Sequence, residues 1–353
     1  MKKELPREIK ELLKKGVVIP AHPTALTKDL KLDHQRQRAL SRYYLDAGVG
    51  GVAVGVHTSQ FEIRDIGIYE EVLRLASEEI DVFTSKNNKT IIKIAGVLGR
   101  SEQAKNEAKM ALKHNYHAAL ISLTALKGQS NQELIAHCKS ISEIIPLIGF
   151  YLQTAVGGQV LDTDFWREFS KIDNVVAIKM APFDRYNTLD VIRGVAESGR
   201  AGDIALYTGN DDNIIADLLT TYEVPVGDNI ISLEIVGGLL GHWAVWTKKA
   251  VETFERIKNV NTNDIGKLLT LGAKITDANA AIYDTRNNFV GSIAGVHKIL
   301  VRQGFLDDIT TINPKESLSI GQEEEINRVY SIYPELNDDK FVSDNIDKWM
   351  GLN

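Results

Sequence analysis

Residues 147–179 read LIGFYLQTAVGGQVLDTDFWREFSKIDNVVAIK, and they contain one full repeat of the unit from which we predict the fold. An apolar run, Leu147–Tyr151, opens the stretch, and a second apolar run, Val175–Lys179, closes it. Between them, Asp162 precedes a short segment whose aromatic residues share one face of a helix. Two apolar runs of strand length joined by an amphipathic helix predict a parallel βαβ unit.

The same pattern recurs along the first 240 residues. Four successive apolar runs begin at residues 91, 119, 147 and 175, so each start follows the last by 28 residues. Helix-capping residues lie between the runs: Asp33 and Gly48 frame one helix, and Ser130 with Glu133 forms a capping-box pattern before another. The predicted strands are Val17–Ala21, Gly51–Gly55, Ile91–Ala95, Ala119–Leu123, Leu147–Tyr151, Val175–Lys179, Ile204–Thr208 and Gly237–Gly241.

Eight βα units favour a closed (β/α)8 TIM barrel, of the α/β class, over an open doubly wound sheet. The open sheet usually carries a glycine-rich nucleotide fingerprint after its first strand, and the segment Gly48-Val49-Gly50-Gly51 lacks the third glycine at the right offset. No Walker A sequence occurs either. We therefore predict a barrel with a short N-terminal helix over residues 1–260 and a helical extension packed on it over residues 261–353.

The composition excludes several classes of function. The chain is 44% hydrophobic and 25% charged, which is typical of a globular protein with a proper core. A net charge of −6 argues against a nucleic-acid or polybasic membrane partner. The single cysteine, Cys138, excludes an intrachain disulfide. Because the sequence has neither a signal-peptide core nor a run of transmembrane length, we expect a cytoplasmic protein.

Two side chains stand out at the ends of the predicted strands, where the active site of a (β/α)8 barrel lies. Tyr151 and Lys179 end neighbouring strands and are 28 residues apart, so we expect both to project into one barrel mouth. Desolvation lowers the pKa of a lysine, so that its neutral amine can attack a carbonyl. A nearby phenol can transfer protons during that reaction. The alternative interpretations are a lysine that reaches solvent and an aromatic ring that closes the barrel.

Other predicted strand ends provide candidate substrate-binding residues. The candidates are Gly55, Val56, His57 and Thr58 after the second strand, Gly209 after the seventh and Leu240 near the end of the eighth. Backbone N–H groups in the loop after the second strand could bind a carboxylate. His57 could add a proton donor there, or it could be an ordinary solvated loop histidine.

Three segments resemble the dihydrodipicolinate synthase/N-acetylneuraminate lyase family: PLIGFYLQTAVGG at 146–158, VVAIKMAPFDRY at 175–186 and YTGNDD at 207–212. The resemblance runs in the same order from about Gly16 to Leu306. It implies a (β/α)8 barrel with C-terminal helices, no cofactor, a homotetramer or dimer, and class I aldolase chemistry on pyruvate or another 2-oxo acid. The family's imine-forming lysine falls on Lys179 and its proton-transferring tyrosine on Tyr151.

Two departures from the family bear on the substrate. Dihydrodipicolinate synthases carry a tyrosine after strand four and an arginine soon after the strand-five tyrosine. Here the corresponding segments, residues 123–126 and 152–158, read LTAL and LQTAVGG, without either residue. The chain therefore does not resemble a typical dihydrodipicolinate synthase, and we expect an aldehyde or sugar-acid partner other than the semialdehyde of lysine biosynthesis.

Other functions remain open at this point. The eight histidines show no HxH or HExxH spacing, so we expect no metal site. Gly209 and the pair Gly237-Gly238 lie where sugar-phosphate barrels bind phosphate, although glycines also simply permit tight turns. A dihydrodipicolinate synthase proper and a catalytically inactive ligand-binding barrel are further alternatives, because a fold does not fix a function.

Overall fold

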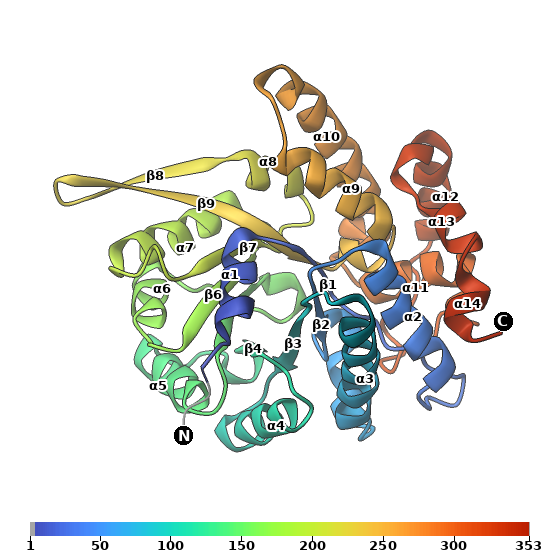
Figure 1. The fold of residues 1–353 in the computed structure, drawn as a ribbon, viewed down its shortest axis with the longest axis horizontal. Coiled ribbons are helices and arrows are strands. Elements are labelled where there is room, and N and C mark those ends of the chain that lie inside the picture. The colour runs from blue at the N-terminus through green and yellow to red at the C-terminus, as the bar shows by residue number, and fades with distance from the viewer. Residues whose placement is uncertain (1–3, 353) are drawn as a thin grey trace. The chain divides into compact units, whose positions relative to one another are not determined.

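The computed structural model describes residues 4–352 (Figure 1). The chain divides into two compact units. The first unit holds residues 4–17 and 92–239, and the second holds residues 18–91 and 240–352. The predicted boundary at residue 260 lies inside the second unit and stays a prediction. Among the described residues, no helix is both long and apolar enough to cross a membrane.

A parallel sheet forms the centre of the first unit, with the strand order β9-β7-β6-β5-β4-β3. Every residue of β3, β4 and β5 is buried, as expected for strands covered on both faces. The strands are β3 (Ile92–Val97), β4 (Ala118–Ile121), β5 (Leu147–Leu152), β6 (Val175–Ala181), β7 (Ala205–Thr208) and β9 (Asn229–Leu240). The helices are α1 (Arg7–Lys15), α4 (Ser101–Lys113), α5 (Asn131–Ser142), α6 (Thr163–Ser170), α7 (Arg185–Glu197) and α8 (Ile214–Leu219).

Two helices of the first unit, α5 and α6, begin where the sequence predicted. The Ser130 hydroxyl accepts a hydrogen bond from the Glu133 N–H, and the Glu133 carboxylate accepts one from the Ser130 N–H. This pair is the predicted capping box before α5. Asp162 accepts from the Phe165 N–H at the start of α6. Each cap satisfies an N–H group that has no partner inside its helix, so the helix start is fixed by a local interaction.

A β-hairpin in the first unit was not predicted. Strand β8 (Thr221–Val226) pairs antiparallel with the first half of β9 around a turn at Gly227, which has a φ of 59°. The paired side chains Tyr222 and Leu233 share one face of the hairpin. Figure 1 shows the hairpin as a long yellow ribbon beside α7, and β8 contacts that helix. The predicted eighth strand, Gly237–Gly241, is therefore the second half of a longer strand.

The second unit combines two short strands with the remaining helices. Strands β1 (Val18–Pro20) and β2 (Gly51–Val54) are joined by a parallel bridge between Ala21 and Ala53. The helices are α2 (His34–Ala47), α3 (Tyr69–Asn87), α9 (Thr247–Lys258), α10 (Ile265–Ile282), α11 (Ser292–Arg302), α12 (Gln322–Ile332), α13 (Asp339–Ser343) and α14 (Ile346–Met350). In chain order the elements of both units are those of the predicted (β/α)8 barrel: eight parallel strands with helices between them, then C-terminal helices.

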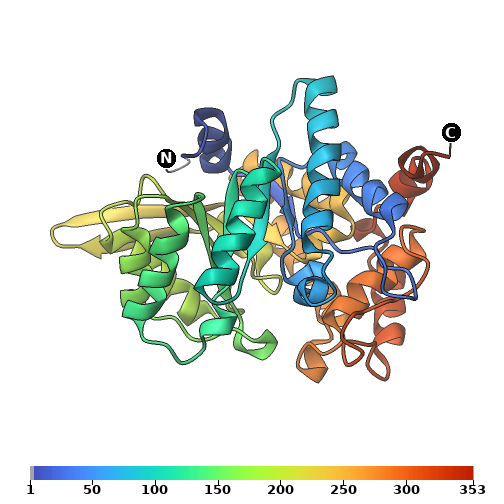
Figure 2. The same cartoon turned by 90° about the horizontal axis from the view of Figure 1, so that it is seen from below.

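Helix α2 has the predicted ends, and the C-terminal helices pack against it. Asp33 accepts a hydrogen bond from the Arg36 N–H, and Gly48 ends the helix in the left-handed conformation with a φ of 102°. Helices α2 and α14 are in contact, and Figure 2 shows the red C-terminal helix beside the blue one. The Tyr43 ring lies 5.4 Å from the Trp349 ring, and its hydroxyl donates to Asp338 over 2.7 Å. The end of the chain is therefore part of the core of this unit.

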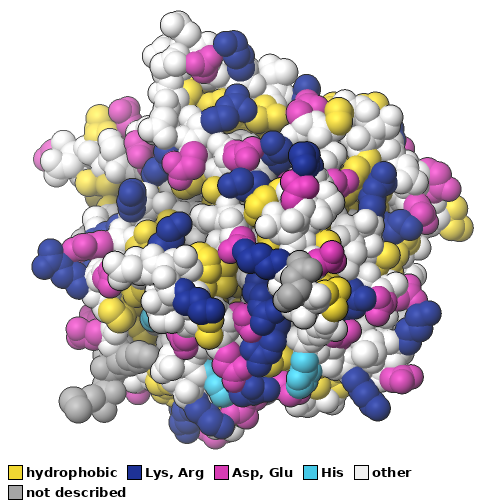
Figure 3. All heavy atoms as spheres, turned by 45° about the vertical axis from the view of Figure 1, so that its right-hand side comes forward, with side chains coloured by type: hydrophobic (Ala, Val, Ile, Leu, Met, Phe, Trp, Pro, Cys, Tyr) yellow, Lys and Arg dark blue, Asp and Glu magenta, His cyan; other side chains and the backbone are white. Residues whose placement is uncertain are grey.

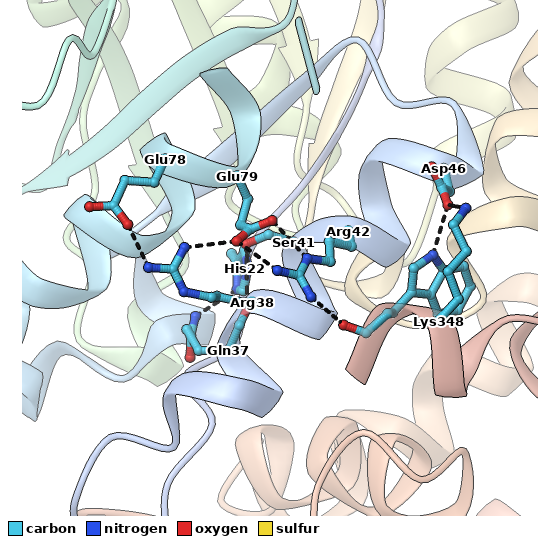
Figure 4. A network of polar contacts seen from close by, with 10 residues as sticks. His22, Gln37, Arg38, Ser41, Arg42, Asp46, Glu78, Glu79 and Lys348 are labelled. Atoms are coloured by element: carbon cyan, nitrogen blue, oxygen red, sulfur yellow. Dashed lines mark hydrogen bonds and ion pairs between the residues drawn. The ribbon is translucent and has the colours of Figure 1, made fainter. Parts of the chain in front are cut away.

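Ion pairs reinforce the same contact (Figure 4). Glu79 of α3 accepts hydrogen bonds from Arg38 and Arg42 of α2 at 2.7 Å each. Arg42 also donates to the Trp349 carbonyl over 2.7 Å, and Asp46 accepts from the Trp349 indole N–H over 2.8 Å. Figure 3 shows Lys and Arg side chains interspersed with Asp and Glu on the face that it draws. Helices α2, α3 and α14 are thus linked by paired charges as well as by packing.

Replacing Trp349 with alanine should destabilise the protein by about 3 kcal/mol, because the ring is 1% exposed and its removal leaves a cavity. Urea unfolding followed by far-UV circular dichroism measures the change. The control is Leu352→Ala, a side chain that is 66% exposed, for which we expect a change below about 0.5 kcal/mol. Equal midpoints for the two variants would contradict the role of α14 in the core.

Candidate active site

Lys179 lies in the middle of a buried strand of the first unit. Six of the seven residues of β6 are buried, with Val176 as the exception, and the Lys179 side chain is 7% exposed. The strand continues for two residues beyond Lys179, so the expectation that this residue ends the strand is corrected. A lysine is almost never buried in this way unless it is paired or used in chemistry.

The surroundings of the amine are mostly apolar. Its Nζ atom lies 4.4 Å from the centroid of the Phe150 ring, and Phe150 is the register partner of Lys179 on β5. Beyond β7, Gly209 leaves room for the lysine stem: a Cβ atom at this position would lie 2.5 Å from Lys179 Cε. The structure therefore brings together Lys179 and the predicted residue Gly209, and it adds Phe150.

Burial changes the acid–base properties of this amine. Desolvation lowers the pKa of Lys179 from 10.5 to about 8, and the nearby negative charge of Asp211 opposes part of that change. At pH 7 a group with that pKa is neutral in roughly one molecule in ten, compared with fewer than about one in a thousand for an exposed lysine. The neutral amine needed for attack on a carbonyl is thus present near neutral pH.

The loop after β7 is fixed by a buried polar network. Asp217 accepts hydrogen bonds from the Thr208 hydroxyl over 2.7 Å and from the Asn210 amide over 2.9 Å. Asn210 in turn accepts from the Phe183 N–H over 3.1 Å. This network holds Gly209 against the lysine stem and keeps Asp211, which is 6% exposed, near the amine. Asp211 was not among the predicted site residues, although it lies within the YTGNDD segment.

Tyr151 does not lie on the same face as Lys179. Its register partner is Met180, and side chains alternate between the two faces of a strand. The ring packs 5.4 Å from the Trp166 ring of α6, and the hydroxyl accepts a hydrogen bond from the Leu161 N–H over 3.1 Å. The expectation that Tyr151 and Lys179 project into one mouth was therefore wrong, because a shift of one residue in register exchanges the faces.

Replacing Tyr151 with phenylalanine should therefore change the rate of any reaction at Lys179 by less than about threefold, while stability falls by about 1–2 kcal/mol as the Leu161 N–H loses its acceptor. Single-turnover adduct formation and urea unfolding measure the two effects. A rate loss above about 100-fold with an unchanged fold would instead place the phenol in the chemistry at Lys179.

The remaining predicted site residues belong to the second unit. Gly55, with a φ of 72°, turns the chain after β2 into the short 3-10 helix η1 (His57–Ser59). The Ser59 hydroxyl accepts from the backbone N–H groups of Gly55 and Val56 over 2.9 and 3.2 Å, which orders the loop. The His57 ring packs against Phe61 at 5.6 Å.

Two further candidates in this unit, Thr58 and Leu240, are both buried. Thr58 is 7% exposed, and its side chain ends in a hydroxyl that can donate a hydrogen bond. Leu240 is fully buried at the end of β9, and its carbonyl accepts from the Ala21 N–H over 3.2 Å. Leu240 therefore contributes to strand pairing through its backbone.

The described residues contain no group of three or more His, Cys, Asp or Glu side chains that could hold a metal ion. Two histidines of the second unit, His22 and His242, are buried. His22 lies 2.8 Å from the Ser41 hydroxyl and 2.7 Å from the Pro23 carbonyl, as Figure 4 shows for the serine. Burial lowers the pKa of both His22 and His242 to about 4, so both rings are neutral near pH 7.

The sequence of this chain is similar to that of a known lyase. N-acetylneuraminate lyase 2 of Escherichia coli is 22% identical over 293 residues, which is 82% of this chain and 85% of that protein. No protein-family model matches the chain. The match covers most of both sequences, and it supports lyase activity at a coarse level.

Solved structures of related proteins share the fold. Dihydrodipicolinate synthase from Oceanobacillus iheyensis superposes with a TM-score of 0.73 at 15% identity, covering 92% of this chain and 99% of that one. The chloride-inhibited dihydrodipicolinate synthase from Acinetobacter baumannii, complexed with pyruvate, gives a TM-score of 0.69 at 20% identity over 90% of this chain and 98% of that one. The predicted (β/α)8 barrel with C-terminal helices is thus confirmed.

Proposed function

Because this chain belongs to the dihydrodipicolinate synthase/N-acetylneuraminate lyase family, we propose that it is a class I lyase that binds a 2-oxo acid as a Schiff base on Lys179. One observation carries the proposal: the Lys179 amine is buried against Phe150 and Gly209, and its pKa is lowered to about 8. This is the environment that makes a lysine nucleophilic toward a carbonyl. Pyruvate bound in the related synthase supports a small 2-oxo acid as ligand.

The proposed chemistry starts with attack of the neutral amine on the ketone carbon. The carbonyl oxygen leaves as water, taking one proton from the nitrogen and one from a donor, and an iminium ion remains. For cleavage, a base takes the proton from the hydroxyl group on the carbon that becomes the aldehyde. The C–C bond between that carbon and the carbon next to the iminium then breaks, and its electron pair passes to the iminium. The aldehyde departs and an enamine remains. Protonation of the enamine carbon and hydrolysis return the 2-oxo acid and the free lysine. Condensation is the reverse sequence.

The other predicted site residues bind the substrate or leave room for the lysine side chain in this proposal. We assign the carboxylate of the 2-oxo acid to the backbone N–H groups of His57 and Thr58, with the Thr58 hydroxyl as an additional donor. Gly209 keeps space for the lysine stem. Tyr151 receives no catalytic role, because its hydroxyl accepts from the Leu161 N–H on the other face of β5. A homotetramer or dimer in the cytoplasm completes the proposal.

The absence of two residues makes the synthase reaction the weaker alternative. The segments 123–126 and 152–158 lack the tyrosine and the arginine that dihydrodipicolinate synthases carry there. We therefore propose an aldehyde or sugar-acid substrate of different chemistry. Screening 2-keto-3-deoxy sugar acids for release of the smaller 2-oxo acid would identify it.

Incubation with pyruvate and sodium borohydride tests the Schiff base directly, since borohydride reduces an iminium to a stable amine. Intact-mass measurement should show one pyruvate-derived adduct per chain. The control is incubation with lactate, which has no ketone and should add nothing. An unmodified chain that still binds pyruvate would contradict the lyase and favour a ligand-binding barrel, and activity lost to a chelator would favour a metal-dependent enzyme.

A further inference from the structure

Gln60 has a strained backbone in the loop that follows β2. It lies between the short 3-10 helices η1 (His57–Ser59) and η2 (Phe61–Arg64), with a φ of 64° and a ψ of 117°. A residue with a Cβ atom rarely adopts this combination, and it persists only where the surroundings fix the chain. The Gln60 side chain is 1% exposed, so the strained residue is buried inside the second unit.

Hydrogen bonds within the loop connect Gln60 to the residues before it. The Gln60 N–H donates to the His57 carbonyl over 2.8 Å. The Ser59 hydroxyl donates to the His22 carbonyl over 2.6 Å, and the Ser59 carbonyl accepts from the Thr24 hydroxyl over 2.7 Å. The conformation of η1 is therefore coupled to that of Gln60.

The Gln60 side chain makes one hydrogen bond, to a residue far away in the sequence. Its Oε1 atom accepts from the Ile312 N–H over 2.7 Å. Its Nε2 atom is buried and has no hydrogen-bond partner within residues 4–352. A buried donor without a partner lowers stability. The chain thus keeps both an unfavourable backbone conformation and an unsatisfied amide at the residue that bonds to Ile312.

Ile312 belongs to the connecting segment, residues 307–321, which lies between α11 and α12 and contains no helix or strand. An ion pair between Asp307 and Arg36 holds the start of this segment. The Ser319 hydroxyl holds its end by donating to Asp284 over 2.5 Å. The hydrogen bond of Ile312 lies between these two anchors.

Glu316 brings the connecting segment against the same loop at a second place. Burial and the negative charge of Glu62 raise the pKa of Glu316 to about 7. The Glu316 Oε2 atom is buried and has no hydrogen-bond partner in the part of the chain that the structure describes. Glu62 lies in η2, two residues after Gln60. The connecting segment therefore lies along the loop and does not touch it at one atom only.

We propose that Gln60 is a positioning residue for the ligand. Through the hydrogen bond from Ile312, the connecting segment holds η1 in the conformation in which His57 and Thr58 bind a carboxylate. The carboxylate assignment rests on the proposed function, and every residue involved lies in the second unit. Without this bond the strain at Gln60 lets the loop relax, so a smaller fraction of the molecules is competent to bind.

Gln60→Met tests the coupling, because it removes the acceptor and keeps the length of the side chain. Hydrogen exchange should show the Ile312 amide losing protection about tenfold or more. The Ser59 and Ile63 amides, which donate to the carbonyls of residues 56 and 60, should lose protection with it. A loss confined to Ile312 would overturn the proposal, because the loop would then keep its conformation without the connecting segment.

Gln303→Met is the matched control. Gln303 is also a buried glutamine of the second unit, 8% exposed, and its Nε2 atom donates to Asp338 and Asp339 over 2.9 Å each. Its replacement reproduces the loss of a buried amide, and we expect the Ser59 and Ile63 amides to keep their protection. Equal loss in both variants would indicate a general fall in stability and overturn the specific role of Gln60.

Calorimetric titration with pyruvate tests the effect on the ligand separately from the Schiff base. It is carried out on Lys179→Ala, so that no imine contributes, and on the same variant with Gln60→Met or Gln303→Met added. We expect binding about tenfold weaker with Gln60→Met and unchanged with Gln303→Met. This result supports the role of Gln60 even if the wild-type protein traps no adduct, in which case only the Schiff base fails. Equal affinities, or no binding in any variant, overturn the role of Gln60 even if the wild-type protein does trap an adduct.

Ile312→Pro breaks the same hydrogen bond from the other side, because proline has no N–H group. In the Lys179→Ala protein it should weaken pyruvate binding about as much as Gln60→Met does, and the two changes together should weaken it no further. Additive losses, or unchanged binding in Ile312→Pro, would overturn the proposed coupling.

Discussion

Lys179→Met should abolish the pyruvate adduct, with a loss of more than about 1,000-fold in the rate of its formation, because the nucleophile is removed. Methionine is unbranched and apolar, so it can fill the space beside Phe150 without a buried charge. The measurement is intact mass after borohydride reduction, with far-UV circular dichroism as the test of folding.

Lys93→Met is the matched control for this variant. Lys93 is also a buried strand lysine, on β3 and 3% exposed, so its replacement reproduces the loss of a buried ammonium group. We expect the control to keep the adduct. If both variants lost it, the effect would be one of folding. An adduct that persisted in Lys179→Met would move the nucleophile to another residue.

The rate of adduct formation should increase with pH, by about tenfold per pH unit up to about pH 8, and should level off at higher pH. The neutral amine is the attacking species, and the pKa of Lys179 is lowered to about 8, so deprotonation is nearly complete above that value. Between pH 6 and pH 8 the neutral fraction grows roughly 50-fold. An exposed lysine, with a pKa near 10.5, would still be gaining rate at pH 9.

Single-turnover borohydride trapping at saturating pyruvate measures this profile, since saturation removes the pH dependence of binding. Asp211→Asn sharpens the test. The negative charge of Asp211 raises the pKa of Lys179 against the effect of burial, so its removal should move the midpoint to lower pH. A midpoint near 10, or one that moves upward in Asp211→Asn, would contradict the assigned environment.

The fold was predictable because its signals are local and repeated. The 28-residue spacing of the apolar runs located strands β3 to β6, and Asp33, Ser130 and Asp162 marked helix starts that the structure confirms. The hairpin of β8 and β9 was missed because Gly237-Gly238 was taken for part of an isolated strand. The turn at Gly227 is the local signal that could have revealed it.

The candidate site was predictable only in part. Lys179 stands out because an ammonium group interrupts an apolar run, which is visible in the sequence. Phe150 and Tyr151 could not be told apart, since the choice depends on a register of one residue between β5 and β6.

Peptide mapping of the borohydride-reduced protein tests the central claim most directly. After reduction with pyruvate at pH 8, the modification should lie on the peptide that contains Lys179, and fragmentation should assign it to that side chain. A reduced adduct on any other lysine, or a protein that binds pyruvate and carries no modification at all, would contradict the account.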